Sequence, residues 1–142
     1  MERKVSCMGI VIFDDKIEQA VLVMENDSEI VFPKGHVEFG EDHIDTVIRE
    51  MREETGIFIE RSNCAGKINE FEFYFEGENA IKVIEVYLFK IQTKQEPHPN
   101  TAEGINSAYW LSTPEALKRL THDDARNSLH TALTTLGGPT PK

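Results

Sequence analysis

The chain has 142 residues, which is enough for one compact domain and too few for two ordinary ones. Hydrophobic residues make up 39% of the sequence and charged residues 28%, as is typical of a soluble globular protein. The formal net charge is −10, so we expect neither a nucleic-acid polymer nor an anionic membrane as a partner. An anionic small molecule is compatible with this charge if a bound metal or a local group of cations meets it.

Two cysteines, Cys7 and Cys64, are too few for a disulfide framework and show no metal-ligand spacing. Both lie in apolar, strand-like stretches, which predicts buried thiols in a reducing compartment. The first residues lack the apolar segment of a signal peptide, and no apolar run is long enough to span a bilayer. We therefore expect a cytoplasmic protein, either a monomer or a homodimer.

The first half of the chain predicts three strands and a helix. Apolar runs indicate strands over 5–13, 19–24 and 29–32, separated by polar turns at 14–16 and 26–28. A loop is expected after Gly35, followed by a helix over 42–55. Asp42 is the expected N-terminal cap of this helix, and Gly56 the left-handed residue that ends it.

The second half predicts a long hairpin and two further helices. Strands are expected over 67–75 and 80–92 around a turn at 76–79, then a polar loop over 93–104 and a strand over 107–111. Ser112, Pro114 and Glu115 mark a helix start, and another helix is expected over 123–136 before a frayed tail, 137–142. The expected fold is one α/β domain over 1–142, with a mixed sheet flanked by helices.

The helix over 42–55 places acidic side chains beside an apolar stripe. At about 100° per residue, Glu50, Glu53 and Glu54 share one narrow face. The face is self-repelling and lies near the C-terminal end of the helix, where the helix dipole disfavours anions. A hard divalent cation such as Mg²⁺ would relieve both effects. The alternative is a solvated acidic face paired with Arg49 and Arg52.

The sequence around this face favours the metal interpretation. The stretch from Gly35 to Ile57 is GHVEFGEDHIDTVIREMREETGI, and its glycines and charged residues stand at the spacing of the Nudix box. The chain therefore resembles the Nudix family, and the resemblance extends loosely from Ser6 to Trp110. It implies a Nudix-type α/β/α sandwich. The matching positions of the box are Gly35, Glu41, Arg49, Glu50, Glu53, Glu54 and Gly56.

The resemblance also implies roles for these residues. Glu50 and Glu54 would hold the metal, helped by the backbone carbonyl of Gly35. Glu53 would bind a further metal or act on the attacking water. Arg49 would orient the carboxylates through charge-assisted hydrogen bonds. Glu41 is expected to have a structural role at the start of the helix, with direct ligation of the metal as the alternative.

The segment FPKGHVE, residues 32–38, resembles the asymmetrical diadenosine tetraphosphate hydrolases and, more weakly, the diphosphoinositol polyphosphate phosphohydrolases. A net charge of −10 disfavours the highly phosphorylated inositol substrates. The resemblance implies that Lys34 and Lys82 contact phosphate and that Tyr74 stacks on adenine. The plain alternative is two solvated lysines and a packed strand aromatic.

Two features lie outside the box. No Phe, Tyr or Trp follows Trp110, so the second ring of an adenine clamp is either missing or replaced by His122 or His130. Glu103, in the loop before Trp110, is by resemblance a metal ligand or a general base, and otherwise a solvated loop acid. The sequence does not choose between Glu53 and Glu103 as the base.

The implied function is metal-dependent hydrolysis of a diphosphate bond in a nucleotide substrate. The cofactor would be Mg²⁺, with Mn²⁺ as a substitute. The preferred prediction is asymmetrical cleavage of diadenosine tetraphosphate to ATP and AMP. A nucleoside triphosphate pyrophosphohydrolase and a non-catalytic nucleotide sensor are the alternatives.

Overall fold

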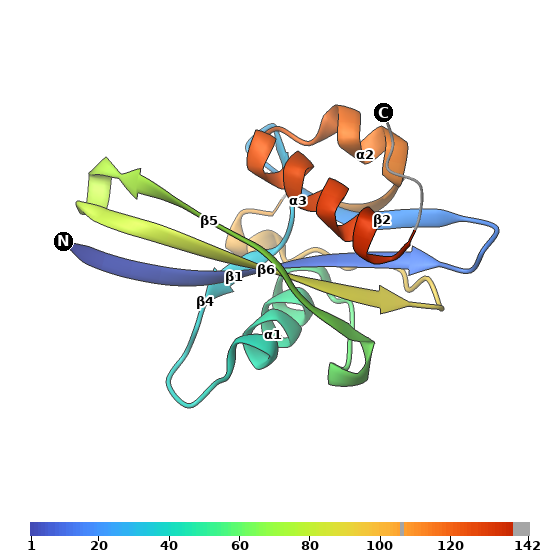
Figure 1. The fold of residues 1–142 in the computed structure, drawn as a ribbon, viewed down its shortest axis with the longest axis horizontal. Coiled ribbons are helices and arrows are strands. Elements are labelled where there is room, and N and C mark those ends of the chain that lie inside the picture. The colour runs from blue at the N-terminus through green and yellow to red at the C-terminus, as the bar shows by residue number, and fades with distance from the viewer. Residues whose placement is uncertain (106, 138–142) are drawn as a thin grey trace.

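The computed structural model describes residues 1–105 and 107–137, and its centre is a mixed sheet (Figure 1). The central strands are β1 (Glu2–Asp14) and β6 (Ala80–Ile91), which pair in parallel along their whole length. The sheet order is β3-β2-β1-β6-β5, with β4 paired to β1 and β7 to β2. The remaining strands are β2 (Gln19–Asn26), β3 (Glu29–Val31), β4 (Lys34–His36), β5 (Cys64–Phe75) and β7 (Ser107–Ser112).

Helices cover both faces of the sheet and enclose two apolar cores (Figure 1). On one face lies α1 (His43–Thr55), whose Val47 and Met51 are buried against β1 and β6. On the other face lie α2 (Thr113–Arg119) and α3 (Asp123–Thr135), which bury Leu120 and Leu129. The predicted mixed sheet flanked by helices is confirmed. No helix among the described residues is long and apolar enough to cross a membrane.

The local signals predicted α1 correctly. The Asp42 side chain accepts a hydrogen bond from the Asp45 backbone N–H, and Gly56 adopts the left-handed conformation with φ of 76°. The helix packs directly on β1 at Gly9, where an added Cβ would lie 2.7 Å from side-chain atoms of both Val47 and Met51. Glycine at position 9 thus sets how closely the helix and its acidic face approach the sheet.

Some predictions were wrong in detail. Lys34–His36 is a strand, β4, because it pairs with β1 (Cys7 opposite Gly35), a tertiary contact that the turn-like Pro33-Lys34-Gly35 sequence does not reveal. Cys7 is fully buried as predicted, but Cys64 is partly exposed, at the start of the edge strand β5. The first predicted strand is longer than expected, and residues 138–142 of the predicted frayed tail lie outside the described residues.

Candidate active site

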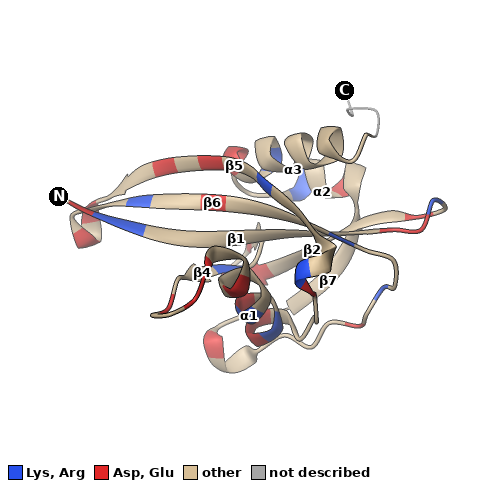
Figure 2. Cartoon of the chain, turned by 60° about the horizontal axis from the view of Figure 1, so that its bottom comes forward, with Lys and Arg blue, Asp and Glu red and all other residues tan. Residues whose placement is uncertain are grey.

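Glu50 and Glu54 project from the last turns of α1 toward β4, and the more exposed Glu53 lies beside them, bonded to Arg49. Figure 2 shows acidic residues gathered on α1 and on the loop that precedes it. Glu54 Oε1 accepts a hydrogen bond from the backbone N–H of Lys34 at 3.0 Å. A Cβ added at Gly35 would lie 2.1 Å from Glu50 Cδ, so only glycine fits where β4 passes this carboxylate. The strand and the helix therefore form a tight cradle that brings Glu50, Glu54 and the Gly35 backbone together.

Arg49 links this cradle to the preceding loop. Its Nη1 donates to Glu50 Oε1 at 2.6 Å and to Glu53 Oε2 at 3.1 Å. Its Nη2 donates to the carbonyl of His36 at 2.9 Å. Nε and Nη2 also donate to the two carboxylate oxygens of Glu41, at 2.6 and 3.1 Å. The Arg49 side chain is only 16% exposed. Such charge-assisted bonds fix the orientation of these side chains. The contacts agree with the role that the resemblance implies for Arg49, which stays a prediction.

Glu41 is fully occupied by contacts with α1 and with its own loop. Besides Arg49, its oxygens accept hydrogen bonds from the Thr46 hydroxyl at 2.9 Å and from the Glu38 backbone N–H at 3.0 Å. The side-chain hydrogen bond from Arg49 is the largest cause that lowers the pKa of Glu41, to about 2. These contacts agree with a structural role for Glu41.

The acidic cradle is electrostatically unfavourable as it stands. Burial raises the pKa of Glu54 to about 8, and the charge of Glu50 adds to this shift, while the Lys34 N–H opposes it. Burial also raises the pKa of Glu50, with Arg49 opposing. A hard divalent cation accepts such carboxylate and carbonyl oxygens and would favour their ionised form. The cradle and its all-oxygen donors therefore fit a divalent metal.

Glu103 approaches the same carboxylates because the loop before it folds back onto α1. The backbone N–H groups of His98 and Asn100 donate to the carbonyls of Thr55 and Glu54 at 2.7 and 3.0 Å. Glu103 closes the short 3₁₀ helix Thr101–Glu103, and its side chain is exposed. Its charge contributes to the raised pKa of both Glu50 and Glu54. The structure thus brings Glu103 near the cradle, although it is far from the box in sequence.

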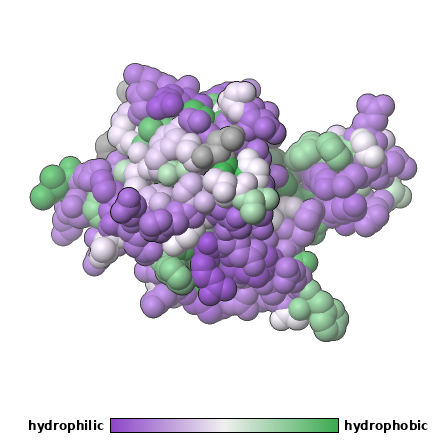
Figure 3. Space-filling view, turned by 180° about the vertical axis from the view of Figure 1, so that it is seen from behind, coloured by the Kyte–Doolittle hydropathy of each residue, from purple (hydrophilic) through white to green (hydrophobic). Residues whose placement is uncertain are grey.

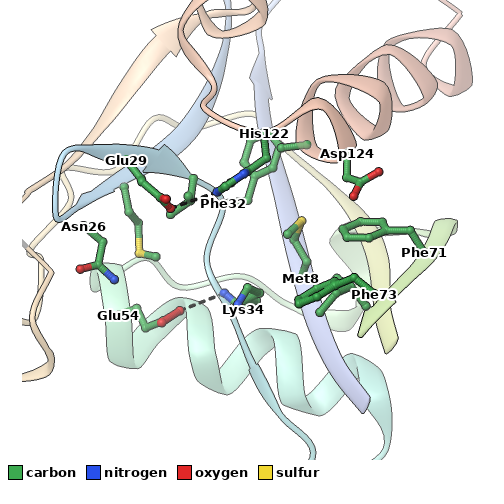
Figure 4. Close-up of a pocket in the computed structure, with 14 residues that line it drawn as sticks. Met8, Asn26, Glu29, Phe32, Lys34, Glu54, Phe71, Phe73, His122 and Asp124 are labelled. Carbon is green, nitrogen blue, oxygen red and sulfur yellow. Dashed lines mark hydrogen bonds and ion pairs between the residues drawn. The ribbon is translucent and has the colours of Figure 1, made fainter. Parts of the chain in front are cut away.

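A cavity of about 480 Å³ opens beside the cradle (Figure 4). Lys34 and Glu54 lie on one side of it, and Phe71, Phe73 and His122 on another (Figure 4). This size falls within the range of small-molecule sites. The lining residues are Met8, Met24, Asn26, Glu29, Val31, Phe32, Lys34, Glu54, Phe71, Phe73, Ile84, His122, Asp124 and Ala125.

The predicted substrate residues are not all brought to this cavity. Lys34 lines it. Lys82 pairs with Phe73 and so shares the cavity face, but its Nζ bonds to Glu78 at 2.6 Å and lies over the Phe75 ring. Tyr74 lies on the opposite face of β5, because successive strand residues alternate, and its hydroxyl donates to Asn79. Tyr74 is therefore not among the residues that line this cavity, and its stacking on a base stays a prediction.

The aromatic residues that do line the cavity were missed. Phe71 and Phe73 belong to a run of phenylalanines at every second position of β5, a signal that was present in the sequence. His122, one of the two histidines considered as a second ring, lines the cavity, where its Nε2 lies 3.0 Å from Glu29 Oε2. Asp124 and Asn26 add polar groups that no sequence pattern singled out.

A second group of metal-binding residue types lies on the α1 face of the sheet. Cys7, His43 and Glu85 place ligand atoms within 4.8 Å of one another. His43 Nδ1 lies 2.6 Å from Glu85 Oε1, and the Tyr87 hydroxyl donates to the same oxygen at 2.7 Å. Burial raises the pKa of the Cys7 thiol to about 12. The polar atoms satisfy one another and the thiol stays protonated, so this group is structural.

Comparison with known proteins identifies the family. The model of the NUDIX domain matches residues 3–132, and the chain therefore belongs to the Nudix family. A Mycobacterium tuberculosis protein (strain CDC 1551 / Oshkosh) assigned the name mutator protein MutT4 is 29% identical over 96 residues. That match covers 66% of this chain but only 37% of the relative, so the chain spans well under half the length of the relative.

Solved structures share the fold at low identity. A Caenorhabditis elegans Ap4A hydrolase, solved as a binary complex, superposes with a TM-score of 0.74 at 18% identity, covering 94% of this chain and 98% of that one. The NUDIX domain of Shewanella oneidensis NrtR, solved with ADP-ribose, gives a TM-score of 0.79 at 13% identity, covering 96% and 90%. The fold is thus shared by an Ap4A hydrolase and by a domain that was solved with ADP-ribose.

Proposed function

We propose that this chain is a metal-dependent hydrolase that cleaves a diphosphate bond in a nucleotide substrate. The observation that carries the proposal is the partly buried pair Glu50 and Glu54, held against the Gly35 backbone at the edge of a cavity of about 480 Å³. Membership of the Nudix family supports the same chemistry.

The residues divide into a metal-binding group and a proton-transfer group. Glu50, Glu54 and the Gly35 carbonyl would hold Mg²⁺, or Mn²⁺ in its place, with Glu53 and Glu103 available as further ligands. When bound, the ion would neutralise phosphate oxygens and lower the pKa of a bound water. Glu53, whose side chain is 42% exposed, and the exposed Glu103 are the two candidate bases for that proton. Arg49 holds Glu50 and Glu53 in place during the reaction.

The cavity has a charged side and an aromatic side, which suit the phosphate chain and the base of a nucleotide. Lys34, next to Glu54, offers a positive charge where a polyphosphate chain would leave the cradle. Phe71 and Phe73 offer ring faces on which a base can stack, and such stacking tolerates any base. We therefore propose asymmetrical cleavage of diadenosine tetraphosphate to ATP and AMP, with modest discrimination between adenine and guanine. The tetraphosphatase-like FPKGHVE segment supports this choice.

A nucleoside triphosphate pyrophosphohydrolase is the second candidate. Asp124 and Asn26 line the cavity and offer an acceptor and an amide to the polar edge of a base, as a site selective for one base requires. A nucleotide sensor is the third candidate, but a sensor has no need of the complete set Glu50, Glu53 and Glu54.

Product analysis tests the proposal directly. Diadenosine tetraphosphate, dGTP and a nucleotide sugar are incubated with the protein in Mg²⁺ or in EDTA, and the products are separated by chromatography. ATP plus AMP in Mg²⁺ alone supports the tetraphosphatase, two ADP contradicts it, and much faster hydrolysis of dGTP supports the second candidate. Glu54→Gln, a matched control of the same shape, should abolish turnover. Nucleotide binding without any product would show a sensor.

A further inference from the structure

The strand β5 forms one side of an arm that extends beyond the helices. The arm consists of residues 2–5 of β1, 71–75 of β5 and 80–83 of β6, and it stands away from the body in Figures 1 and 3. β5 ends the sheet order and pairs with β6 on one side only. Within residues 1–105 and 107–137, no strand pairs with its other edge. Its outward backbone groups are therefore free to pair with another strand.

The side chains on this edge are unusual for an exposed strand. Residues 71–75 are Phe-Glu-Phe-Tyr-Phe, and Phe73, Tyr74 and Phe75 are 44%, 51% and 44% exposed. Natural edge strands are commonly protected by lysine, proline or a bulge, and the irregularities of β5 lie earlier, between residues 64 and 69. Neither lysine nor proline occurs in 71–75. The arm thus exposes aromatic side chains next to unpaired backbone.

We propose that β5 pairs antiparallel with β5 of a second copy of this chain, about a two-fold axis at Phe73. The five-residue pattern is symmetric about this residue, so Phe71 lies opposite Phe75 of the second copy, and Phe73 opposite its own counterpart. All these aromatic side chains then meet on one face of the joined sheet. On the other face, Glu72 lies opposite Tyr74 of the second copy.

Charge and strand length together favour this register over its neighbours. An axis at Glu72 places that carboxylate directly opposite its counterpart, and like charges across a ladder are destabilising. An axis at Tyr74 pairs only residues 73–75, because β5 ends at Phe75. With the axis at Phe73, the facing pairs within 71–75 include no like charges. Glu72 is also neutralised within its own chain, because Arg3 Nη2 bonds to it at 2.7 Å. The negative charge of Glu72 on this edge is therefore balanced within one copy, although the chain as a whole has a net charge of −10.

The pairing brings an aromatic residue of one copy to the cavity of the other. Phe71 lines the cavity, and Phe75 of the second copy lies opposite it in the proposed register. The chain has no aromatic residue after Trp110 that could form the second side of a base clamp. Phe75 of the second copy fills that role. This consequence rests on the proposed nucleotide hydrolysis, whereas the dimer itself does not.

Sedimentation velocity without substrate tests the dimer. A five-residue strand pairing is small, so we expect a reversible equilibrium that shifts from monomer to dimer over roughly a hundredfold range of concentration. Tyr74→Glu places an acid opposite Glu72 of the second copy twice per dimer, and should weaken association about tenfold or more. Phe58→Glu is the matched control, since Phe58 is an exposed aromatic outside β5, and it should leave association unchanged.

A charge exchange tests the register. Within β5, which ends at Phe75, the double variant Glu72→Lys, Tyr74→Glu places a lysine opposite a glutamate only if the axis lies at Phe73, and it should restore association. Circular dichroism confirms folding of each variant. A wild-type protein that is monomeric throughout, a Tyr74→Glu variant that associates normally, a Phe58→Glu variant that dissociates equally, or a double variant that stays monomeric would each overturn the proposal.

Discussion

Replacing Glu54 by Gln removes a partly buried carboxyl whose ionised form destabilises the metal-free fold. Burial and the charge of Glu50 raise the pKa of Glu54 to about 8 in the metal-free protein, against a reference value of 4.5. A carboxyl whose pKa is raised on folding favours the folded state below its unfolded pKa, and that stability is lost as the pH rises through the folded pKa. The metal-free wild-type protein should therefore lose stability between about pH 4.5 and pH 8, and Glu54→Gln should not.

The size of the effect follows from the shift. At about 1.4 kcal/mol per pKa unit, the full shift corresponds to no more than about 5 kcal/mol, and relaxation around a partly buried group reduces it to a few. A chain of this size changes its melting temperature by about 3–4 °C per kcal/mol. We expect metal-free Glu54→Gln to melt several degrees above the wild type at pH 8.5, and the difference to shrink at pH 5.

Thermal denaturation in EDTA across this pH range measures the effect. Glu96→Gln, which removes one charge from an exposed loop residue, is the matched control and should follow the wild type. Adding Mg²⁺ at pH 8.5 should raise the melting temperature of the wild type and not that of Glu54→Gln, because only the wild type retains the ligand. A Glu54→Gln variant that melts below the metal-free wild type at pH 8.5 would refute the reasoning.

Three further predictions concern the cradle and the cavity. Gly35→Ala places a Cβ 2.1 Å from Glu50 Cδ and must displace that carboxylate, so kcat should fall about 100-fold. Gly77→Ala is the control, because its Cβ meets nothing closer than 3.4 Å, and it should keep wild-type kinetics. Arg49→Lys should destabilise the protein near pH 7 by about 1–3 kcal/mol in urea unfolding. That loss should vanish toward pH 2, because Arg49 lowers the pKa of Glu41 and the resulting stability exists only above the unfolded value. Lys34→Ala should raise KM for a tetraphosphate about tenfold in steady-state assays, and more than for a monophosphate-linked substrate; equal changes would place the phosphate chain elsewhere.

The sequence predicted those parts of the fold whose causes are local. The helix α1 was predicted because Asp42, Gly56 and the apolar stripe containing Val47 and Met51 all act within a few turns of one another. The strand β4 was missed because its only cause is pairing with β1, some thirty residues away along the chain (Ser6 opposite His36). The prediction used only the local turn residues around Pro33 and Gly35, which indicate a loop.

The candidate site likewise has parts that follow from local sequence and parts that depend on tertiary contacts. The spacing of Glu50, Glu53 and Glu54 on one helix face follows from helical geometry alone. Which face of β5 meets the cavity depends on how β5 pairs with β6, and the resemblance led to Tyr74, whereas the structure places Phe73 there. The position of Glu103 depends on backbone bonds between a polar loop and the end of α1, which no periodicity encodes.

The two interpretations of the acidic helix face make different demands on its arginines. A solvated, ion-paired face requires that Arg49 and Arg52 neutralise exposed glutamates. Arg49 does bond to Glu50 and Glu53, but it is committed equally to Glu41 and to the His36 carbonyl. Arg52 is exposed and makes no ion pair within residues 1–105 and 107–137.

Glu54 is the residue that separates these interpretations. It is more buried than Glu53, it has no arginine partner among the described residues, and it accepts a single hydrogen bond, from the Lys34 N–H. A partly buried carboxylate with so little compensation destabilises the metal-free fold, and burial is the largest cause of its raised pKa. A divalent cation would offset this penalty for Glu54 and Glu50 together. The arrangement is therefore better explained as a metal-binding cradle than as a solvated surface.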